Sequence, residues 1–302
     1  MTIAYLAPEE RKEDLLTELK HRGVTVSREC DRLILAETGP TDVVWAQNIW
    51  SDVETLSFQS IKEASQLLRE RGRNWALYPF QNVRRAKLIE QQLPYFKPRP
   101  LTFPTELPSS PVGAWTLLDD KTMLVSKNTD SPMALGEYKF VEDKVSPPSR
   151  AYLKLWEALT RVSQMPDAQS RCMDLGACPG GWSWVLLNLG VKLQSVDKAP
   201  LDERIMKHPN LTYRQESAFG IDPKKEEKVD WLFSDIICYP PRLLNLVERW
   251  LEADKAKNFI FTIKFQGETD TETLNKFLKI EGSYARHLYN NKHEVTWFLI
   301  RD

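Results

Sequence analysis

Four charged side chains occupy positions where buried segments begin or end. Lys264 and Asp235 each end a predicted buried strand, and Glu294 opens another. Lys154 lies on a predicted helix just before the first strand of the C-terminal part, near 171–175. A charge beside a buried segment needs a partner or a function. Two lysines and two carboxylates at one sheet edge form a candidate catalytic cluster for proton transfer. For any one of them, a solvated strand end or a structural ion pair remains an alternative.

A second candidate site is the segment Asp174-Leu-Gly-Ala-Cys-Pro-Gly-Gly-Trp182, which lies between a short buried strand and an apolar helix. Gly176, Gly180 and Gly181 allow a ligand to lie against the backbone, and the free N–H groups of the following helix point toward it. Asp197 ends the next apolar stretch, where a carboxylate can accept hydrogen bonds from both hydroxyls of a ribose. The segment therefore predicts a cofactor that contains a nucleoside.

The loop residues narrow the choice of cofactor. Cys178, followed by Pro179, stands at the second glycine position of the dinucleotide fingerprint, so NAD and FAD fit poorly. Asp174 at the start of the loop suits a cationic ligand. S-adenosylmethionine has an ammonium, a ribose and an adenine but no phosphate, and it is the predicted cofactor. An ordinary Gly-Pro turn in an α/β protein is the alternative.

The composition of the chain limits the classes of protein to which it can belong. A chain of 302 residues with 27% charged and 42% hydrophobic residues suits a globular protein of about two domains. We expect no membrane span and no signal peptide, because no apolar run is long enough. The four cysteines form no C-x-x-C pair, so we expect no metal site and no disulfide framework, as in a reducing cytoplasm. At a net charge of −1, any nucleic-acid contact must come from local basic patches.

The elements that position these residues alternate in the C-terminal part of the chain. We predict helices near 150–163, 241–251 and 270–278, and strands near 171–175, 192–197, 211–214, 229–235, 259–264, 284–289 and 294–300. Five strands with βα connections and a terminal hairpin match the seven-stranded methyltransferase sheet. A ligand of such a sheet binds beyond the carboxyl ends of the strands.

Two proline-rich stretches, 94–111 and 145–150, suggest the domain boundaries. They predict an N-terminal α/β region over 1–100, a hairpin and linker over 101–147, and a catalytic domain over 148–302. The hairpin itself is expected over 114–125.

The chain resembles the FtsJ/RrmJ-type ribose 2′-O-methyltransferases, and among them most closely the large-subunit ribosomal RNA methyltransferase M subfamily. The resemblance covers residues 111–302 and is weaker before them. Its marks are a Lys-Asp-Lys-Glu tetrad and the D-L-G-A-x-P-G-G-W loop, whose cysteine form is typical of that subfamily. The matching segments are Pro148-Ser-Arg-Ala-Tyr-Leu-Lys-Leu, the loop 174–182, Asp230-Trp-Leu-Phe-Ser-Asp-Ile, Phe259-Ile-Phe-Thr-Ile-Lys and Leu288-Tyr-Asn-Asn-Lys-His-Glu-Val-Thr.

This resemblance implies a Rossmann-like S-adenosylmethionine-dependent domain with a smaller N-terminal α+β domain of the ferredoxin-like and THUMP-like type that presents RNA. It implies 2′-O-methylation of 23S-type large-subunit ribosomal RNA, at a cytidine, in the cytoplasm, without metal, membrane or DNA. The implied catalytic residues are Lys154, Asp235, Lys264 and Glu294. The implied cofactor-binding residues are Ser149, Asp174, Gly176, Cys178, Pro179, Gly180, Gly181, Trp182, Asp197, Ser217, Phe219 and Asp235.

Two points of this interpretation stay open. Lys264 either takes the 2′ proton as a general base or stays charged and steers the hydroxyl. Ser217 stands where the family usually has an aspartate, and a serine binds the adenine amino group more weakly than a carboxylate does, so we expect a modest cofactor affinity.

Two rival functions are a non-catalytic RNA-binding relative and an enzyme that methylates a base or a protein. The filled tetrad disfavours the first. The second commonly shows an Asn/Asp-Pro-Pro-Tyr/Phe signature, and Asp235-Ile-Ile-Cys-Tyr-Pro-Pro is out of register with it.

A basic and aromatic segment in the N-terminal region is a candidate RNA-binding surface. Trp75 and Tyr78 are among the aromatic residues interleaved with the basic ones, a combination that suits phosphates and unstacked bases. The predicted RNA-binding residues are Arg69, Arg71, Arg73, Arg84, Arg85 and Lys87. The alternative is a solvated helix face over an ordinary core, and Trp75 and Leu77 suit strand core positions.

Overall fold

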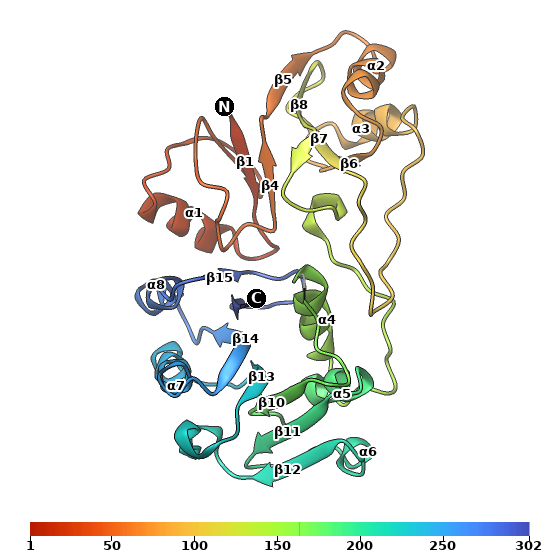
Figure 1. Ribbon diagram of the computed structural model, residues 1–302. Coiled ribbons are helices and arrows are strands. Elements are labelled where there is room, and N and C mark those ends of the chain that lie inside the picture. Colours follow the sequence, from red (N-terminus) through yellow and green to blue (C-terminus); the bar gives the residue numbers. More distant parts are fainter. Residues whose placement is uncertain (163, 302) are drawn as a thin grey trace. The chain divides into compact units, whose positions relative to one another are not determined.

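A computed structural model describes residues 1–162 and 164–301 (Figure 1). The chain divides into two compact units. Unit 1 consists of Met1–Leu101 and Glu106–Lys139, and unit 2 of Thr102–Thr105 and Phe140–Asp302. No helix in the described part of the chain is long and apolar enough to cross a membrane.

Unit 1 is an α+β unit with two sheets. The first sheet is antiparallel, in the order β2-β3-β1-β4-β9. Its strands are β1 (Ile3–Leu6), β2 (Val26–Cys30), β3 (Leu33–Ala36), β4 (Asn48–Ser51) and β9 (Asn128–Thr129), and helix α1 (Lys12–His21) joins β1 to β2. All four residues of β1 and of β3 are buried, which places these strands in the core of the sheet.

The second sheet of unit 1 has the order β5-β8-β7-β6. Its strands are β5 (Glu54–Ser57), β6 (Trp75–Leu77), β7 (Gly113–Leu117) and β8 (Thr122–Ser126). The predicted hairpin over 114–125 corresponds to β7 and β8, which pair in antiparallel fashion. Helices α2 (Ile61–Arg71) and α3 (Val83–Glu90) contribute Ala64, Leu68, Ala86 and Ile89 to the core over this sheet. A short 3-10 turn, η1 (Ala134–Gly136), follows β9 in the chain. The buried Trp75 and Leu77 confirm that these two residues belong to a strand core.

Unit 2 is a seven-stranded sheet in the order β12-β11-β10-β13-β14-β16-β15. The first five strands of that order run parallel, and β16 is antiparallel to both its neighbours. The strands are β10 (Arg171–Leu175), β11 (Lys192–Asp197), β12 (Leu211–Gln215), β13 (Val229–Ser234), β14 (Ala256–Lys264), β15 (Ser283–Arg286) and β16 (Glu294–Leu299). This confirms the predicted doubly wound methyltransferase sheet.

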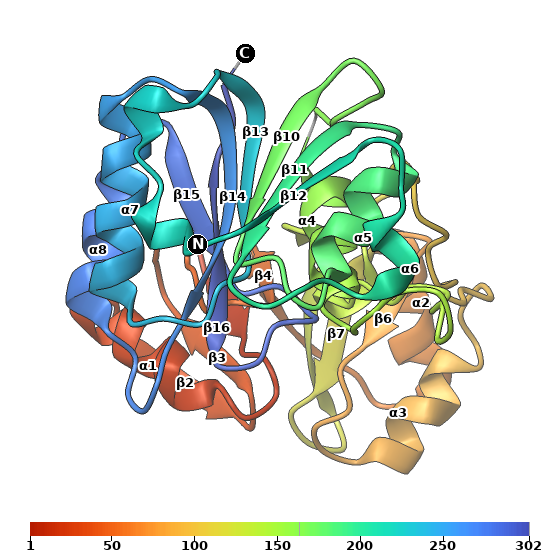
Figure 2. The same ribbon diagram turned by 90° about the horizontal axis from the view of Figure 1, so that it is seen from below.

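Helices cover both faces of this sheet (Figure 2). Helices α7 and α8 lie on one face, and α4, α5 and α6 lie on the other. Their bounds are α4 (Tyr152–Arg161), α5 (Gly181–Asn188), α6 (Glu203–Met206), α7 (Pro240–Glu252) and α8 (Thr271–Leu278), with 3-10 turns η2 (Ala218–Gly220) and η3 (Pro223–Lys225). The central strands β13 and β14 are buried over most of their length because they are covered on both sides.

One strand ends earlier than its sequence suggests. We predicted a strand over 284–289, but β15 stops at Arg286. The backbone N–H groups of Tyr289 and Asn290 donate instead to the carboxylate of Glu157 on α4. A side chain from another element thus replaces the sheet as the hydrogen-bond partner of this segment.

Candidate active site

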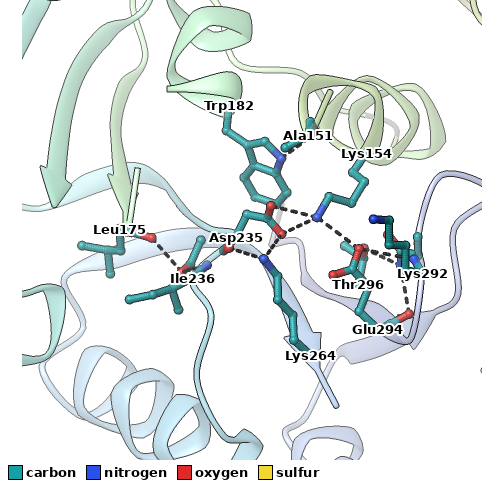
Figure 3. Close-up of polar contacts among 12 residues, drawn as sticks. Ala151, Lys154, Leu175, Trp182, Asp235, Ile236, Lys264, Lys292, Glu294 and Thr296 are labelled. Atoms are coloured by element: carbon teal, nitrogen blue, oxygen red, sulfur yellow. Dashed lines mark hydrogen bonds and ion pairs between the residues drawn. The ribbon is translucent and has the colours of Figure 1, made fainter. Parts of the chain in front are cut away.

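The four charged residues singled out from the sequence lie together (Figure 3). Lys154 Nζ donates to Asp235 Oδ1 at 2.6 Å and Oδ2 at 2.8 Å, and lies 3.1 Å from Glu294 Oε1. Lys264 Nζ lies 3.1 Å from Asp235 Oδ1 and donates to the backbone oxygen of Asp235 at 2.6 Å. Asp235 therefore lies between the two ammonium groups, and the four groups form one connected cluster.

The sheet explains why these residues meet. Lys264, the last residue of β14, is the direct cross-strand partner of Glu294, the first residue of β16. Asp235 follows β13, the parallel neighbour of β14 on its other side. Because β16 runs antiparallel to β14, its first residue falls at the carboxyl edge where the parallel strands end. Helix α4 brings Lys154 to the same edge.

The two lysines have different surroundings. Burial lowers the pKa of Lys154, but the carboxylates of Asp235 and Glu294 outweigh that effect, so the pKa is raised overall. Lys154 therefore stays charged and holds both carboxylates in place. Lys264 Nζ contacts Asp235 through one carboxylate oxygen and one backbone oxygen. Lys264 also borders an adjacent cavity, as Asp235 does.

A fully buried glutamate, Glu157, connects the two elements that carry Lys154 and Glu294. This residue was not singled out in the sequence analysis. Glu157 lies one turn after Lys154 on α4, and its carboxylate accepts hydrogen bonds from Arg161 Nε and Nη2. The same carboxylate accepts from the backbone N–H groups of Tyr289 and Asn290 and from Asn290 Nδ2. Glu157 thus fixes the segment that leads into Glu294 onto the helix that carries Lys154.

The adjacent cavity measures about 480 Å³ and lies against the glycine loop. Most of the predicted cofactor residues border it: Ser149, Asp174, Gly176, Cys178, Pro179, Gly181, Trp182, Asp197 and Asp235. Ala151, Ala177, Ala199, Ile236 and Ile237 complete the lining together with Lys264. Cluster and cavity therefore share one edge of the sheet.

Asp174 is the buried acidic group of this cavity. Its Oδ2 accepts a hydrogen bond from Ser183 Oγ at 2.7 Å. Burial raises the pKa of Asp174 to about 7, and the nearby carboxylates of Asp235 and Asp197 act in the same direction. A carboxylate in this environment gains from a cationic ligand, because the ligand would compensate the cost of its charge.

Asp197 and Ser149 are two further polar residues that border the cavity and can contact a ligand. Asp197 is held by its backbone neighbours, since Oδ2 accepts from the N–H of Cys178 at 3.0 Å and Oδ1 from that of Ala199 at 2.9 Å. Ser149 Oγ is buried and has no hydrogen-bond partner among residues 1–162 and 164–301. A buried hydroxyl without a partner is costly, and a ligand in the cavity could supply one.

The glycines of the loop serve packing as well as ligand access. Gly180 has a φ of +111°, and a Cβ there would lie 2.2 Å from Ile205 Cδ1. Gly180 is absent from the cavity lining, so the structure explains this glycine by its backbone conformation and its contact with α6. At Gly181 a Cβ would lie 2.4 Å from Ser149 Oγ. Here the missing side chain leaves room for Ser149.

A second cavity of about 240 Å³ shares Gly176, Asp197, Ile236 and Ile237 with the first. Both predicted adenine-pocket residues, Ser217 and Phe219, border it. Arg242, which sequence reasoning missed, also borders it, and its guanidinium carbon lies 3.8 Å from the centre of the Phe219 ring. An arginine two residues into a helix gives no sequence signal of such a contact.

The predicted RNA-binding residues lie on α2, on α3 and just after α2. Arg71 forms an ion pair with Glu54, and Lys87 one with Glu90. Arg69 donates to the backbone oxygen of Gln92, and the Arg85 guanidinium lies over the Phe58 ring at 5.5 Å. Arg73 and Arg84 are exposed. Much of the basic charge in this segment is thus engaged within unit 1.

The strand order, the glycine loop between β10 and α5, and a cavity at the carboxyl edge define unit 2 as a Rossmann-like methyltransferase fold. Residues 147–283 match the family described as FtsJ-like methyltransferase. This part of unit 2 is therefore similar to the FtsJ-like methyltransferases, in agreement with the resemblance seen in the sequence.

Curated relatives point the same way. The chain is similar to proteins named ribosomal RNA large subunit methyltransferase M. The relative from Halorhodospira halophila is 33% identical over 162 residues, which are 51% of this chain and 47% of the relative. The relative from Saccharophagus degradans is 35% identical over 170 residues, 51% of this chain and 48% of the relative. The chain thus spans about half the length of these two curated relatives.

Solved structures show weaker likeness. The fibrillarin pre-rRNA processing protein of Methanococcus jannaschii has a TM-score of 0.38 and 18% identity, covering 49% of this chain and 74% of that one. An rRNA methylase from Streptococcus thermophilus has a TM-score of 0.34 and 14% identity, covering 45% and 89%. At such scores, these structures add nothing to the assignment made from the sheet and the family match.

Proposed function

We propose that this protein is an S-adenosylmethionine-dependent methyltransferase that modifies a ribose 2′ hydroxyl of large-subunit ribosomal RNA, at a cytidine of a 23S-type molecule, in the cytoplasm. The observation that carries the proposal is the cluster of Lys154, Asp235, Lys264 and Glu294 at the edge of a cavity bordered by the glycine loop. The relatives' names support the ribosomal RNA substrate.

The residues of the cavity fit S-adenosylmethionine. The buried carboxylate of Asp174 would take the ammonium, and Asp197 would take the ribose hydroxyls. Ser149 Oγ and the first N–H groups of α5 would take the carboxylate of the methionine part. Ser217 and Phe219 would hold the adenine in the second cavity. When bound, this cofactor supplies an electrophilic sulfonium methyl group.

Within this proposal, Lys264 handles the proton of the ribose 2′ hydroxyl. A neutral amine has two N–H groups and one lone pair. The two acceptors on Asp235, Oδ1 and the backbone oxygen, take the two N–H groups of Lys264. Lys264 acts as the general base when it is in this neutral form, because its lone pair is then left to accept the 2′ proton; a charged Lys264 would steer the hydroxyl instead. Lys154 stays charged and fixes Asp235 and Glu294, so that the acceptors of Lys264 keep their positions.

The rival function, a non-catalytic RNA-binding relative, needs no such arrangement. A protein that only bound RNA would have no reason to gather two lysines and two carboxylates, largely removed from solvent, beside a cavity, because such ion pairs rarely add stability. The N-terminal basic segment would present the RNA in either case.

The direct test incubates the purified protein with large-subunit ribosomal RNA from cells that lack it and with S-adenosylmethionine labelled on the methyl group. Nuclease digestion and nucleoside chromatography should place the label on a 2′-O-methylated nucleoside. Lys264→Ala should lower the rate about 10²–10⁴-fold, while calorimetry still shows cofactor binding. The exposed Lys279→Ala is the matched control and should keep the wild-type rate. Label on a base, or no label on any nucleoside, would refute the proposal.

A further inference from the structure

The segment that joins β13 to α7 exposes two large apolar side chains, Ile237 and Tyr239, and Ile237 borders both cavities of the candidate active site. Ile237 is 76% exposed and Tyr239 is 65% exposed. Exposed apolar side chains that lie close together beside a cavity are a common mark of a binding surface. No step of the function proposed above uses either side chain.

The side chains of Ile237 and Tyr239 lie on the same side of the backbone. Exposure alternates along this extended segment, because Ile237 and Tyr239 are exposed whereas Cys238 and Pro240 are buried. Alternate residues of an extended chain point to opposite sides. The buried positions therefore anchor the segment to unit 2, and the exposed pair faces outward together.

The segment is also held at both ends. At its start, Lys264 Nζ donates to the backbone oxygen of Asp235 at 2.6 Å. At its end, the backbone oxygen of Tyr239 accepts from the N–H groups of Arg242 at 3.0 Å and Leu243 at 3.3 Å, in the first turn of α7. The surface is thus formed in advance, so little ordering entropy would be lost when a ligand binds it.

The location of the surface limits its occupant. Ile237 borders the same cavity as Asp235 and Lys264. The thiol of Cys238 lies close enough to Arg242 and Lys264 for their charges to lower its pKa, although burial outweighs them and raises it to about 11. A nucleotide whose 2′ oxygen reached Lys264 would therefore lie next to this segment, because Lys264 Nζ donates to the backbone oxygen of Asp235 two residues before Ile237.

We propose that Tyr239 and Ile237 form the platform on which the base of the target nucleotide stacks, with the Tyr239 ring against the base and Ile237 at its side. This inference rests on the proposed function and adds the way in which the target nucleotide is held. A flat aromatic ring suits a base that has left its helix, because stacking requires the face of the base to be free. The platform thus selects an unpaired nucleotide.

The test compares Tyr239→Ala and Tyr239→Phe with Tyr284→Ala, a change at a half-exposed tyrosine of β15, outside the segment that joins β13 to α7. The RNA is an oligonucleotide that contains the mapped methylation site. A second oligonucleotide lacks the target base but keeps its ribose. We expect Tyr239→Ala to lower kcat/KM for the intact RNA about 5- to 150-fold, with Tyr239→Phe and Tyr284→Ala near wild type. On the RNA without the base, Tyr239→Ala and wild type should have the same kcat/KM.

Each other result overturns the inference. An unchanged kcat/KM in Tyr239→Ala shows that no base stacks there. A loss of affinity for S-adenosylmethionine of similar size, measured by calorimetry, shows that the ring covers the cofactor instead. An equal loss on both RNAs shows a merely structural effect. If Tyr239→Ala does not fold, Tyr239→Leu takes its place. Failure of the proposed function is separate, since wild-type protein would then methylate no ribose at all.

Discussion

The buried carboxylate of Asp174 should weaken the fold at neutral pH. Its pKa in the folded protein is raised from 3.8 to about 7. The folded state therefore binds this proton more tightly than the unfolded chain does. The stability associated with the protonated form is present below about pH 4 and is lost as the pH rises to about 7. Above pH 7 the ionised Asp174 lowers the free energy of unfolding by about 4 kcal/mol. Each unit of difference between the folded and unfolded pKa corresponds to about 1.36 kcal/mol.

Asp174→Asn should remove this cost, because the amide is neutral and its oxygen can still accept the hydrogen bond from Ser183. At pH 8 we expect the variant to raise the free energy of unfolding of unit 2 by up to about 4 kcal/mol. At pH 4 the variant and wild type should be nearly equal. Urea unfolding followed by tryptophan fluorescence at pH 4, 6 and 8 measures both differences.

The exposed Glu281→Gln is a matched control that removes one carboxylate from the surface of unit 2 and should change stability little at any of these pH values. Calorimetry should also show weaker S-adenosylmethionine binding in Asp174→Asn, since the partner of the ammonium is lost. A gain at pH 8 below about 1 kcal/mol, or an equal gain at pH 4, would refute the reasoning.

Other perturbations test separate parts of the molecule. Glu157→Ala should destabilise unit 2 by about 3–5 kcal/mol in urea unfolding, because Arg161, Tyr289 and Asn290 all lose their hydrogen bonds to this buried carboxylate; a loss below about 1 kcal/mol would contradict that role. Ser217→Ala should weaken S-adenosylmethionine binding a few-fold in calorimetry, and tighter binding would count against a contact with adenine. Arg84→Ala should reduce the slope of log affinity for RNA against log salt by about 1. Arg71→Ala should leave that slope nearly unchanged, because a glutamate already neutralises this arginine; equal slopes in the two variants would remove the RNA-binding surface from α3.

The regular parts of unit 2 could be predicted from the sequence because their signals are local. The bounds predicted for β10 and β11 agree with the structure, and those for β12, β13 and α7 agree within one residue. The convergence of Lys154, Asp235, Lys264 and Glu294 was also predictable, because strand ends in a sheet of this type share one edge. The structure brings all four together.

What the sequence could not show depends on partners far away along the chain. Glu157 looks like one more charged residue on a helix, yet its hydrogen bonds reach Tyr289 and Asn290 and end β15 early. The contact of Arg242 with Phe219 likewise joins two elements whose local patterns say nothing of each other. The exposed pair Ile237 and Tyr239 could have been noticed from the sequence. Both are large apolar residues in a predicted loop, and that loop follows a strand that ends in a candidate catalytic residue.

The position of β16 has a consequence for how the protein is made. This strand follows β15 in the sequence, but it lies between β14 and β15 in the sheet. During translation β14 must therefore wait with an unpaired edge, which is prone to aggregation, until Glu294–Leu299 leaves the ribosome and inserts. Glu294 completes the four-residue cluster in that same event, so the cluster cannot form before the last strand of the sheet is in place.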